Sequence, residues 1–278
     1  MINKCLFPVA GFGTRFLPVT KSVPKEMLPI QTKPLIQHAI DEAMSTNIKS
    51  MLMVINEHKL AIKNYFEPHY YLESLIKDTN KEKLLSDVNY IIDSCSFSYI
   101  DQPKMAGLGN AIYLGKKEIG NSPFAVILPD DLCHNDSCTV LKQMLEIFKE
   151  HPDKCVIAVE EVPLYEVNKY GVISGDYIDG NDNVILVNDM IEKPEPSFAP
   201  SNLAIIGRYI LLPEIFKEIE NTKADHNGEI QITDALLKLA KKEKVLAYKF
   251  KGRRFDCGSI KGFNEANSFF ASLDLNKP

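Results

Sequence analysis

A glycine-containing turn near the start of the chain is the first place where residue types and spacing suggest chemistry. Residues 11–15 read Gly-Phe-Gly-Thr-Arg, and Lys21 and Lys25 follow among prolines that stiffen the loop. Glycines in a turn that leaves a strand let backbone N–H groups approach a phosphate closely. One arginine and two lysines in a stiff loop suit a triphosphate, which concentrates negative charge in a small volume. The alternative is a solvated basic loop whose glycines and prolines only form turns.

Two well-characterised phosphate-binding motifs do not fit this turn. The dinucleotide fingerprint needs a third glycine where Phe16 stands. The P-loop needs Gly-Lys-Ser/Thr at its end, and that sequence is absent. Phe16 therefore disfavours a NAD-dependent oxidoreductase, and a different kind of phosphate-binding turn is expected.

An aspartate stands at the end of the apolar segment 124–128. A carboxylate at the carboxyl end of a parallel strand lies where ligands bind in open α/β sheets. Magnesium prefers one or two carboxylates together with phosphate oxygens and water. Asp130 is therefore a candidate metal ligand, and the alternative is an aspartate that caps the next helix.

The composition is that of an ordinary globular protein. The chain has 278 residues, of which 45% are apolar and 25% charged, and its formal net charge is -5. The apolar content excludes disorder, and a protein that coats nucleic acid would usually be basic. No segment approaches the roughly 18 apolar residues of a membrane helix, and the run 5–9 is shorter than an export-signal core. We therefore expect neither nucleic acid nor membrane as a partner, and a cytoplasmic location.

The six cysteines are scattered, and none forms a Cys-x-x-Cys pair. Free thiols in a reducing cytoplasm are the expected state. A metal site at Cys133, His134 and Cys138 is disfavoured because a second pair of ligands is missing.

Short apolar segments alternate with amphipathic segments in the first part of the chain. The expected strands are 5–10, 51–55, 97–100, 124–128 and 155–159. The expected helices between them are 34–44, 109–119 and 139–150. This alternation predicts an α/β fold in which helices flank a parallel sheet. The carboxyl edge of that sheet would bring the glycine turn and Asp130 together.

The alternation changes after residue 159. Further strands are expected around 170–174, 184–191, 203–212 and 245–250, and further helices at 230–241 and 262–273. Residues 67–93 are a polar, helix-prone insertion that packs on its own domain or contacts a partner. Because no linker-like segment is present, we expect one domain over residues 1–278. A C-terminal extension from about residue 213 is a candidate oligomer contact.

Several segments, taken in order, resemble the sugar-1-phosphate nucleotidylyltransferases. They are Gly-x-Gly-Thr-Arg at 11–15, Pro-Lys-Glu-Met-Leu-Pro-Ile at 24–30, and residues 102–111, 126–131, 170–173, 192–194, 201–209 and 229–235. The resemblance spans nearly the whole chain and is strongest to bacterial members that join UTP to glucose 1-phosphate. Thymidylyltransferase members share the opening motif but differ around the lysine and lack the Ser-Asn-Leu-Ala-Ile form of residues 201–205.

The resemblance implies a Rossmann-like nucleotidyltransferase fold with a mixed, mainly parallel central sheet, extra strands and C-terminal helices. It implies that the phosphate of glucose 1-phosphate attacks the α-phosphorus of UTP, giving UDP-glucose and pyrophosphate, with Mg²⁺ as cofactor. The nucleophile is already an anion, so positioning and charge neutralisation should drive catalysis. A homodimer or homotetramer is implied. Alternatives are an enzyme that uses dTTP or another sugar, and a catalytically silent nucleotide-sugar-binding protein, which the retained charged residues disfavour.

By the same resemblance, several residues contact the nucleotide. Arg15 would hold the β- and γ-phosphates, and Lys25 would bridge the α-phosphate and the incoming phosphate. Gln102 carries a donor and an acceptor that suit the N3–H and O4 edge of uracil. The remaining nucleotide-binding candidates are Ala10, Gly11, Gly13, Thr14, Glu26 and Gly107.

Four of these have narrower expected roles. The backbone of Ala10 and Gly11 would complete recognition of the base. Gly107 would let the ribose approach. Glu26 would either touch the base or brace Lys25, and the sequence leaves both open.

The sugar and the metal have their own implied residues. Lys193 would hold the phosphate of glucose 1-phosphate and Glu192 would accept hydrogen bonds from sugar hydroxyls, while Gly171 would let the glucose approach. Asp130 and Asp256 would hold the metal. Asp131 stands where relatives carry an apolar residue and is left outside the metal set. The expected catalytic residues are Arg15, Lys25, Asp130 and Lys193.

Overall fold

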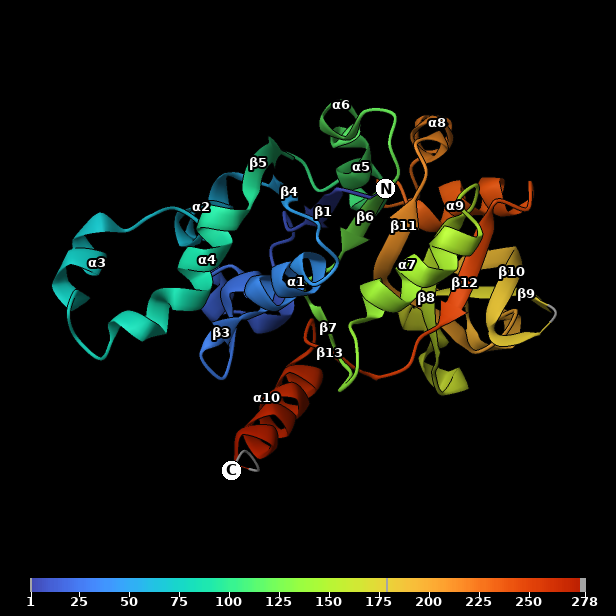
Figure 1. Ribbon diagram of the computed structural model, residues 1–278. Coiled ribbons are helices and arrows are strands. Elements are labelled where there is room, and N and C mark those ends of the chain that lie inside the picture. The colour runs from blue at the N-terminus through green and yellow to red at the C-terminus, as the bar shows by residue number, and fades with distance from the viewer. Residues whose placement is uncertain (1, 179, 276–278) are drawn as a thin grey trace.

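A nine-stranded mixed sheet lies at the centre of the computed structural model, which describes residues 2–178 and 180–275 (Figure 1). The strand order is β5-β4-β1-β6-β11-β8-β12-β10-β9. The strands are β1 (Lys4–Pro8), β4 (Ser50–Ile55), β5 (Ser96–Asp101), β6 (Phe124–Ile127), β8 (Cys155–Glu161), β9 (Gly171–Ile178), β10 (Asn181–Glu192), β11 (Leu203–Leu211) and β12 (Val245–Lys249). The expected α/β class with a mainly parallel sheet is confirmed.

The direction of the strands explains why the polar loops after β1 and β6 lie at the same edge of the sheet. Strands β5, β4, β1 and β6 run parallel, as do β8 and β12, whereas β11 runs antiparallel between β6 and β8. All residues of β6 and β11 are buried, as expected for strands covered on both faces. The parallel strands therefore end at one edge, and the polar loops that follow β1 and β6 meet there.

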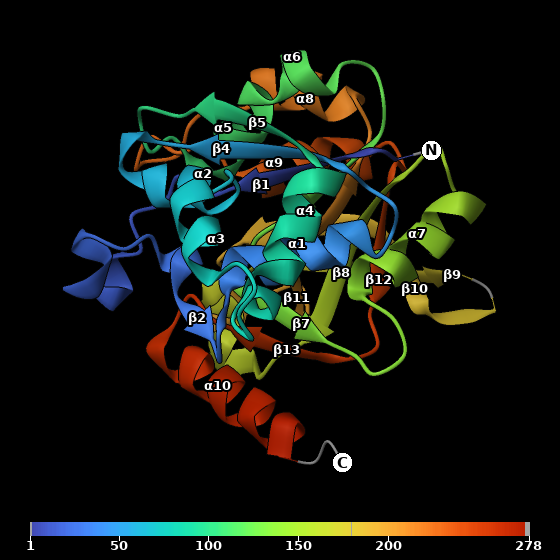
Figure 2. The ribbon, with the colours of Figure 1, turned by 60° about the vertical axis from the view of Figure 1, so that its left-hand side comes forward.

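Helices cover both faces of this sheet (Figure 2). One face carries α1 (Leu35–Met44), α4 (Ser86–Ser94) and α7 (Val140–Glu150). The other carries α5 (Gly107–Leu114), α8 (Glu214–Glu220) and α9 (Ile232–Ala240), which contact one another. The remaining helices are α2 (Leu60–Tyr65), α3 (Tyr70–Ile76), α6 (Lys116–Ile119) and α10 (Ile260–Leu275). Among the described residues, no helix is both long and apolar enough to cross a membrane.

Short elements complete the loops. Strand β7 (Asp131–His134) pairs antiparallel with β13 (Arg253–Asp256), and β2 (Pro29–Ile30) pairs with β3 (Lys33–Pro34). The 3₁₀ helices are η1 (Thr14–Phe16), η2 (Val19–Lys21), η3 (Lys25–Met27), η4 (Glu57–Lys59), η5 (Glu82–Leu85), η6 (Leu164–Lys169) and η7 (Pro196–Phe198). Three of them, η1 to η3, form the basic loop after β1.

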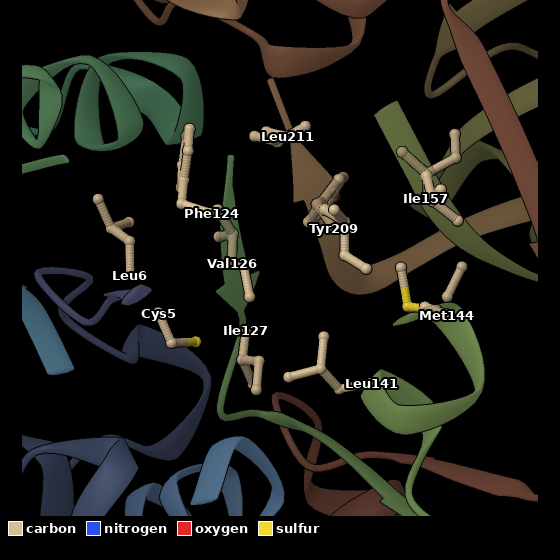
Figure 3. Packing of buried hydrophobic residues seen from close by; sticks show 14 of the residues in the cluster. Cys5, Leu6, Phe124, Val126, Ile127, Leu141, Met144, Ile157, Tyr209 and Leu211 are labelled. Atoms are coloured by element: carbon tan, nitrogen blue, oxygen red, sulfur yellow. The ribbon is translucent and has the colours of Figure 1, made fainter. Parts of the chain in front are cut away.

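The main core lies between the sheet and its helices. Figure 3 shows Cys5 and Leu6 of β1 beside Phe124, Val126 and Ile127 of β6. These side chains are fully buried, and each buried aliphatic or aromatic side chain contributes roughly 1.5–3 kcal/mol. A smaller cluster forms where α10 packs on β7 and β13. The second cluster ties the C-terminal helix to the polar edge of the sheet.

Some elements differ from the expectations. The expected helix 109–119 is two helices, α5 and α6, separated at Gly115. A Cβ at Gly115 would lie 2.4 Å from Cδ1 of Leu6, so close packing on β1 explains the glycine there. Helix α8 and the β7–β13 pair were not expected, because each is too short to show a clear period. Within the insertion, α3 lies away from the sheet (Figure 1).

Candidate active site

The basic loop after β1 folds over the end of β6. Nζ of Lys25 donates a hydrogen bond to Oδ2 of Asp130 at 2.5 Å. Gly13 has φ +65°, and a Cβ there would lie 2.9 Å from Cβ of Lys25. A glycine is therefore needed both for the turn and for its packing on the Lys25 stem. Arg15 Nη1 donates to the carbonyl oxygen of Gly258 at 3.3 Å, and Thr14 is exposed beside it in η1.

The Lys25–Asp130 pair keeps both of its charges. Burial alone would raise the pKa of Asp130, but the ammonium of Lys25 outweighs burial and lowers it. Burial alone would lower the pKa of Lys25, yet Asp130 and Glu26 raise it above its usual value. The site therefore presents an ammonium and a carboxylate at the end of β6 over the whole neutral range.

Glu26 forms a second, deeper ion pair. Its Oε2 accepts from Nζ of Lys59 at 2.7 Å, and Glu26 is only 1% exposed. Burial raises the pKa of Glu26, although Lys59 and Lys25 act in the opposite direction. The structure thus gives Glu26 a partner, Lys59, that the sequence did not suggest. Its two expected roles, contact with the base and bracing of Lys25, stay predictions.

The β7–β13 pair brings Asp256 to Asp130 across some 120 residues of sequence. The N–H of Cys257 donates to the carbonyl oxygen of Asp130 at 2.7 Å. A Cβ built at Gly258 would lie 3.1 Å from Asp130 Oδ2 and 3.1 Å from Asp256 Oδ1. The two carboxylates therefore flank Gly258. Burial, followed by the neighbouring charge of Asp131, raises the pKa of Asp256.

Asp131 forms hydrogen bonds within the protein through both of its carboxylate oxygens. Its Oδ1 accepts from Nε of Arg254 at 2.6 Å, and its Oδ2 accepts from the N–H of Gly207 at 2.8 Å. Arg254 also bonds Glu160, and its guanidinium lies 4.9 Å from the centre of the Tyr170 ring. Both oxygens of Asp131 are therefore engaged, which leaves Asp130 and Asp256 as the two carboxylates available to a ligand.

These two carboxylates suit a hard divalent cation. They border a cavity of about 540 Å³ that Arg15 also lines, so phosphate oxygens and water have room to complete a coordination shell. In the described part of the chain, no three His, Cys, Asp or Glu side chains come together as a complete metal site.

Two of the expected sugar-binding residues line the same cavity. Glu192, at the end of β10, lines it together with Gly171. Oγ1 of Thr233 donates to Oε2 of Glu192 at 2.6 Å and holds that carboxylate in place. A Cβ at Gly171 would lie 2.9 Å from Oγ1 of Thr233, so a larger residue would enter the cavity wall.

Lys193 directly follows Glu192, the last residue of β10. Its side chain is 55% exposed, and its ammonium lies 3.4 Å from Oε1 of Glu192. Its backbone has φ +46°, in the left-handed region that few non-glycine residues adopt. Four other non-glycine residues of the described chain, Gln31, Asn47, Asp78 and Glu243, share this conformation, so the strain alone does not assign Lys193 a role. The structure places Lys193 beside the sugar-binding candidates, and its contact with a phosphate stays a prediction.

A second, smaller cavity lies on the other side of the basic loop. Its volume is about 150 Å³, and Phe12, Asn56, His58, Gln102 and Met105 are among its lining residues. Phe12 borders this cavity and Arg15 borders the larger one, so residues 11–15 lie between the two. A flat ring in the small cavity and phosphates along the loop would fit this arrangement.

The backbone beside the small cavity is held by a buried asparagine. Nδ2 of Asn56 donates to the carbonyl oxygen of Ala10 at 2.5 Å, and its Oδ1 accepts from the N–H of His58. A Cβ at Gly11 would lie 3.9 Å from Cε of Lys25, which is ordinary van der Waals contact. Asn56, which lines the small cavity, therefore holds the backbone at Ala10, and the expected contact of Ala10 and Gly11 with the base stays a prediction.

Gly107 has a packing role that was not expected. Its φ is +88°, and a Cβ there would lie 2.7 Å from the carbonyl oxygen of Ile230. The glycine is therefore required by the close approach of the segment before α9. Its expected contact with a ribose stays a prediction.

Three residues at this site were missed from the sequence: Asn56, Thr233 and Arg254. Thr233 and Arg254 stand in or near segments that resembled the family, but nothing in the spacing showed that they contact Glu192 and Asp131. Asn56 follows β4 directly, and a polar residue at the carboxyl end of a buried strand was the signal that could have found it.

A basic loop, a pair of carboxylates and two cavities on either side of the loop define a nucleotide-transferring site, and comparison with known families agrees. The family model described as Nucleotidyl transferase matches residues 8–272. The chain therefore belongs to the nucleotidyl transferase family, whose members generally use a divalent metal.

Within this family the chain is similar to one group of enzymes. A UTP–glucose-1-phosphate uridylyltransferase of Pseudomonas aeruginosa is 53% identical over 271 residues, which cover 97% of this chain and 96% of that protein. The crystal structure of an apo UDP-glucose pyrophosphorylase has a TM-score of 0.94 and 50% identity, and covers 99% of this chain and 100% of its own. A UDP-glucose pyrophosphorylase complexed with UDP-glucose has a TM-score of 0.89 and 49% identity, covering 98% and 100%. The expected family resemblance is confirmed.

Proposed function

We propose that the protein transfers the uridylyl group of UTP to α-D-glucose 1-phosphate and releases pyrophosphate. The observation that carries the proposal is the Lys25–Asp130 pair, because Asp130 lines the same cavity as Glu192, while Phe12 of the same basic loop lines the smaller cavity. The relative from Pseudomonas aeruginosa is named for this reaction, and the solved neighbour is complexed with its product UDP-glucose. The retained charged side chains support an enzyme over a silent binding protein.

The reaction needs two anions to meet. A phosphate oxygen of glucose 1-phosphate forms a bond to the α-phosphorus of UTP, and the bond from that phosphorus to the bridging oxygen of the β-phosphate breaks. Pyrophosphate leaves with the electron pair, and no proton has to be removed from the nucleophile. At about 4 Å, two unit charges repel by roughly 4 kcal/mol at an effective dielectric of 20. Positive charge at the site is therefore the main catalytic requirement.

Three basic residues can supply this positive charge. Lys25 lies where it can contact both the α-phosphate and the incoming phosphate, because its ammonium is held at the end of β6. Arg15 lines the large cavity and can hold the β- and γ-phosphates with two parallel hydrogen bonds. Lys193, whose ammonium lies 3.4 Å from Glu192, can hold the phosphate of glucose 1-phosphate while Glu192 accepts from sugar hydroxyls.

We assign Asp130 and Asp256 to Mg²⁺. When bound, the ion would polarise phosphate oxygens and neutralise charge that accumulates during transfer. The hard oxygen donors favour Mg²⁺ over softer metals. The engagement of Asp131 by Arg254 and Gly207 supports this choice of carboxylates.

The direct test is product identification. The purified protein is mixed with UTP, glucose 1-phosphate and MgCl₂, and the products are separated by ion-exchange chromatography and identified by mass spectrometry. We expect UDP-glucose and pyrophosphate in equal amounts, and neither product in EDTA. Parallel reactions with dTTP, CTP, GTP and ATP give the nucleotide preference. Equal or better turnover with another nucleotide, or no UDP-glucose at all, would overturn the proposal.

We propose further that residues 1–278 act as one nucleotidyltransferase domain in a cytoplasmic homodimer or homotetramer. The sheet that includes both β1 and β12 supports a single domain. The exposed Tyr70, Tyr71 and Leu84 of the insertion, and the C-terminal helices, offer surfaces for a second copy. All six cysteines are free thiols, which supports a reducing compartment. Light scattering coupled to size-exclusion chromatography measures the mass directly.

A further inference from the structure

A buried ion pair contacts the turn that carries Asp130. Nε and Nη2 of Arg208 donate hydrogen bonds to Oε2 of Glu42, at 3.1 Å and 2.9 Å. Arg208 is 1% exposed and Glu42 is 6% exposed. Burial alone would lower the pKa of Arg208, but the carboxylate of Glu42 outweighs burial and raises it. The guanidinium therefore stays charged inside the protein.

A third nitrogen of Arg208 reaches the backbone of that turn. Its Nη1 donates to the carbonyl oxygen of Leu128 at 3.2 Å. The same carbonyl oxygen accepts from the N–H of Asp131 at 3.2 Å, which closes a β-turn after β6. Asp130 is the third residue of this turn, so the position of its carboxylate depends on where the Leu128 carbonyl group is held.

The position of Arg208 is itself fixed by neighbouring elements. Its Nη1 also donates to the carbonyl oxygen of Gly207 at 3.0 Å, and that oxygen accepts from the N–H of Leu128 at 2.8 Å. On α1, Glu42 uses its second oxygen, Oε1, to accept from the N–H of Leu141 at the start of α7, at 2.8 Å. The ion pair therefore connects α1, α7 and β11 to the turn.

Stability alone does not account for a charged pair at this position. Replacing both members of a buried ion pair by uncharged side chains of similar volume is often neutral or stabilising. An apolar side chain at position 208 would fill the same space, but it could not donate a hydrogen bond to the Leu128 carbonyl oxygen. That hydrogen bond is the contribution that only a donor at position 208 can make to the site.

We infer that Arg208 is a positioning residue, which acts through the Leu128 carbonyl group to hold the Asp130 carboxylate where the metal is bound. The inference rests on the proposed function for the role of Asp130. Because Arg208 is buried, it acts through the turn and is not a catalytic residue. Its loss should therefore weaken metal binding even in a variant whose stability is preserved.

The main variant combines Arg208→Met with Glu42→Gln. It removes both charges together, and glutamine keeps an oxygen for the N–H of Leu141. Because no buried charge is left unpaired, urea should unfold this double variant at a concentration close to that for the unmodified protein. Ile219→Ala, at a buried position on α8, is the control for a general loss of stability.

Two measurements report on the turn without any turnover. Electron paramagnetic resonance gives the dissociation constant for Mn²⁺, a probe of the magnesium site. Hydrogen exchange followed by mass spectrometry gives the protection of the Asp131 N–H in the metal-free protein. We expect the double variant to bind Mn²⁺ about tenfold more weakly, a typical effect of losing a group that orients a metal ligand. The Asp131 N–H should exchange faster, and Ile219→Ala should keep the Mn²⁺ affinity.

Four results would overturn the inference. They are an unchanged Mn²⁺ affinity in the double variant, unchanged exchange of the Asp131 N–H, an equal loss of affinity in Ile219→Ala, and no Mn²⁺ binding by the unmodified protein. If the double variant does not fold, Arg208→Lys replaces it. Lysine keeps a charge opposite Glu42 but lacks the planar fork, so it should show the same weaker Mn²⁺ binding.

The two measurements use neither UTP nor glucose 1-phosphate. A protein that formed no UDP-glucose, but whose Mn²⁺ affinity depended on Arg208, would count against the proposed function and not against the positioning of Asp130.

Discussion

The ammonium of Lys25 donates a hydrogen bond to Oδ2 of Asp130 at 2.5 Å, which joins the loop after β1 to the end of β6. Each of the two side chains is about three-quarters buried, so the contact is shielded from water on most sides. The proposed substrates bring phosphates to this point, where the ammonium can contact phosphate oxygens and the carboxylate can serve the metal. The contact therefore connects the two charged parts of the proposed mechanism.

Lys25→Met should lower kcat about a hundred- to a thousandfold, because a preorganised positive charge beside the reacting phosphates is lost. Methionine keeps much of the stem that packs on Gly13. Initial rates at saturating UTP and glucose 1-phosphate measure the effect, and a thermal melt shows whether the variant folds. A rate within about tenfold of the unmodified protein would exclude Lys25 from the chemical step.

Asp130→Asn should nearly abolish turnover at any magnesium concentration, and Asp256→Asn should raise the concentration needed for half-maximal rate. One carboxylate can be replaced in part by water in a magnesium shell, and the loss of Asp130 also frees Lys25. Activity against MgCl₂ concentration measures both effects, with EDTA as the zero point.

Asp131→Asn is the matched control for these two variants. It should lower the free energy of unfolding by about 3 kcal/mol, because it leaves Arg254 poorly paired in a buried position. It should not change the magnesium concentration needed for half-maximal rate. A shifted magnesium requirement in Asp131→Asn, or a normal response in Asp130→Asn, would contradict the assignment of the carboxylates.

Lys193→Ala should raise KM for glucose 1-phosphate strongly and leave the KM for UTP nearly unchanged. The change removes one ammonium beside Glu192, and the loss of such a contact costs about a hundred- to a thousandfold in rate at low sugar phosphate. Lys193→Gly relieves the left-handed backbone at φ +46° and should lose the same activity, so the two variants separate charge from strain. Lys117→Ala on α6 controls for a general loss of positive charge. If either Lys193 variant kept normal rates at low glucose 1-phosphate, the lysine would have another role.

The protein should lose stability between about pH 6.5 and pH 4 through His38. Burial, with the nearby charge of Lys33, lowers the pKa of His38 to about 4, and its Nε2 is buried without a hydrogen-bond partner in the described structure. The unfolded chain binds a proton near pH 6.5 and the folded chain does not, so stability is complete above that pH and falls as the pH drops toward 4. The loss amounts to roughly 3 kcal/mol.

Urea unfolding at pH 7.5 and at pH 4.5 tests this dependence. His38→Gln should lose less stability than the unmodified protein between the two values, while His226→Gln, at an exposed position, should follow the unmodified protein. Equal losses in all three proteins would show that acid sensitivity arises elsewhere.

The class of fold and the family could be predicted because both depend on local pattern. The apolar segments that became β1, β4, β6 and β8 were expected within a few residues of their ends, since buried parallel strands are continuous apolar runs. The edge strand β5, which is only half-buried, was expected equally closely. Asp130 could be chosen because it directly follows such a run.

The partners of these residues could not be predicted. Asp131 was left outside the metal set because it stands where relatives carry an apolar residue. Its physical role came only from its contact with Arg254, more than a hundred residues later in the chain. Asn110 was part of a segment that resembled the family, yet its contact with Gln102 depends on how α5 packs on Ile230. Short strands such as β7 and β13 are defined by pairing across the chain rather than by their own sequence.

The pairing of β7 with β13 affects the order in which the sheet and the active site of a newly made chain can form. Every strand of the large sheet is contributed by residues that precede 250, whereas Asp256 and the carbonyl oxygen of Gly258 that receives Arg15 come after them. A polypeptide emerging from the ribosome can therefore form its whole sheet before Asp256 has joined Asp130 at the site. The chain would therefore become active only late in folding, after β13 pairs with β7 and α10 packs on this pair.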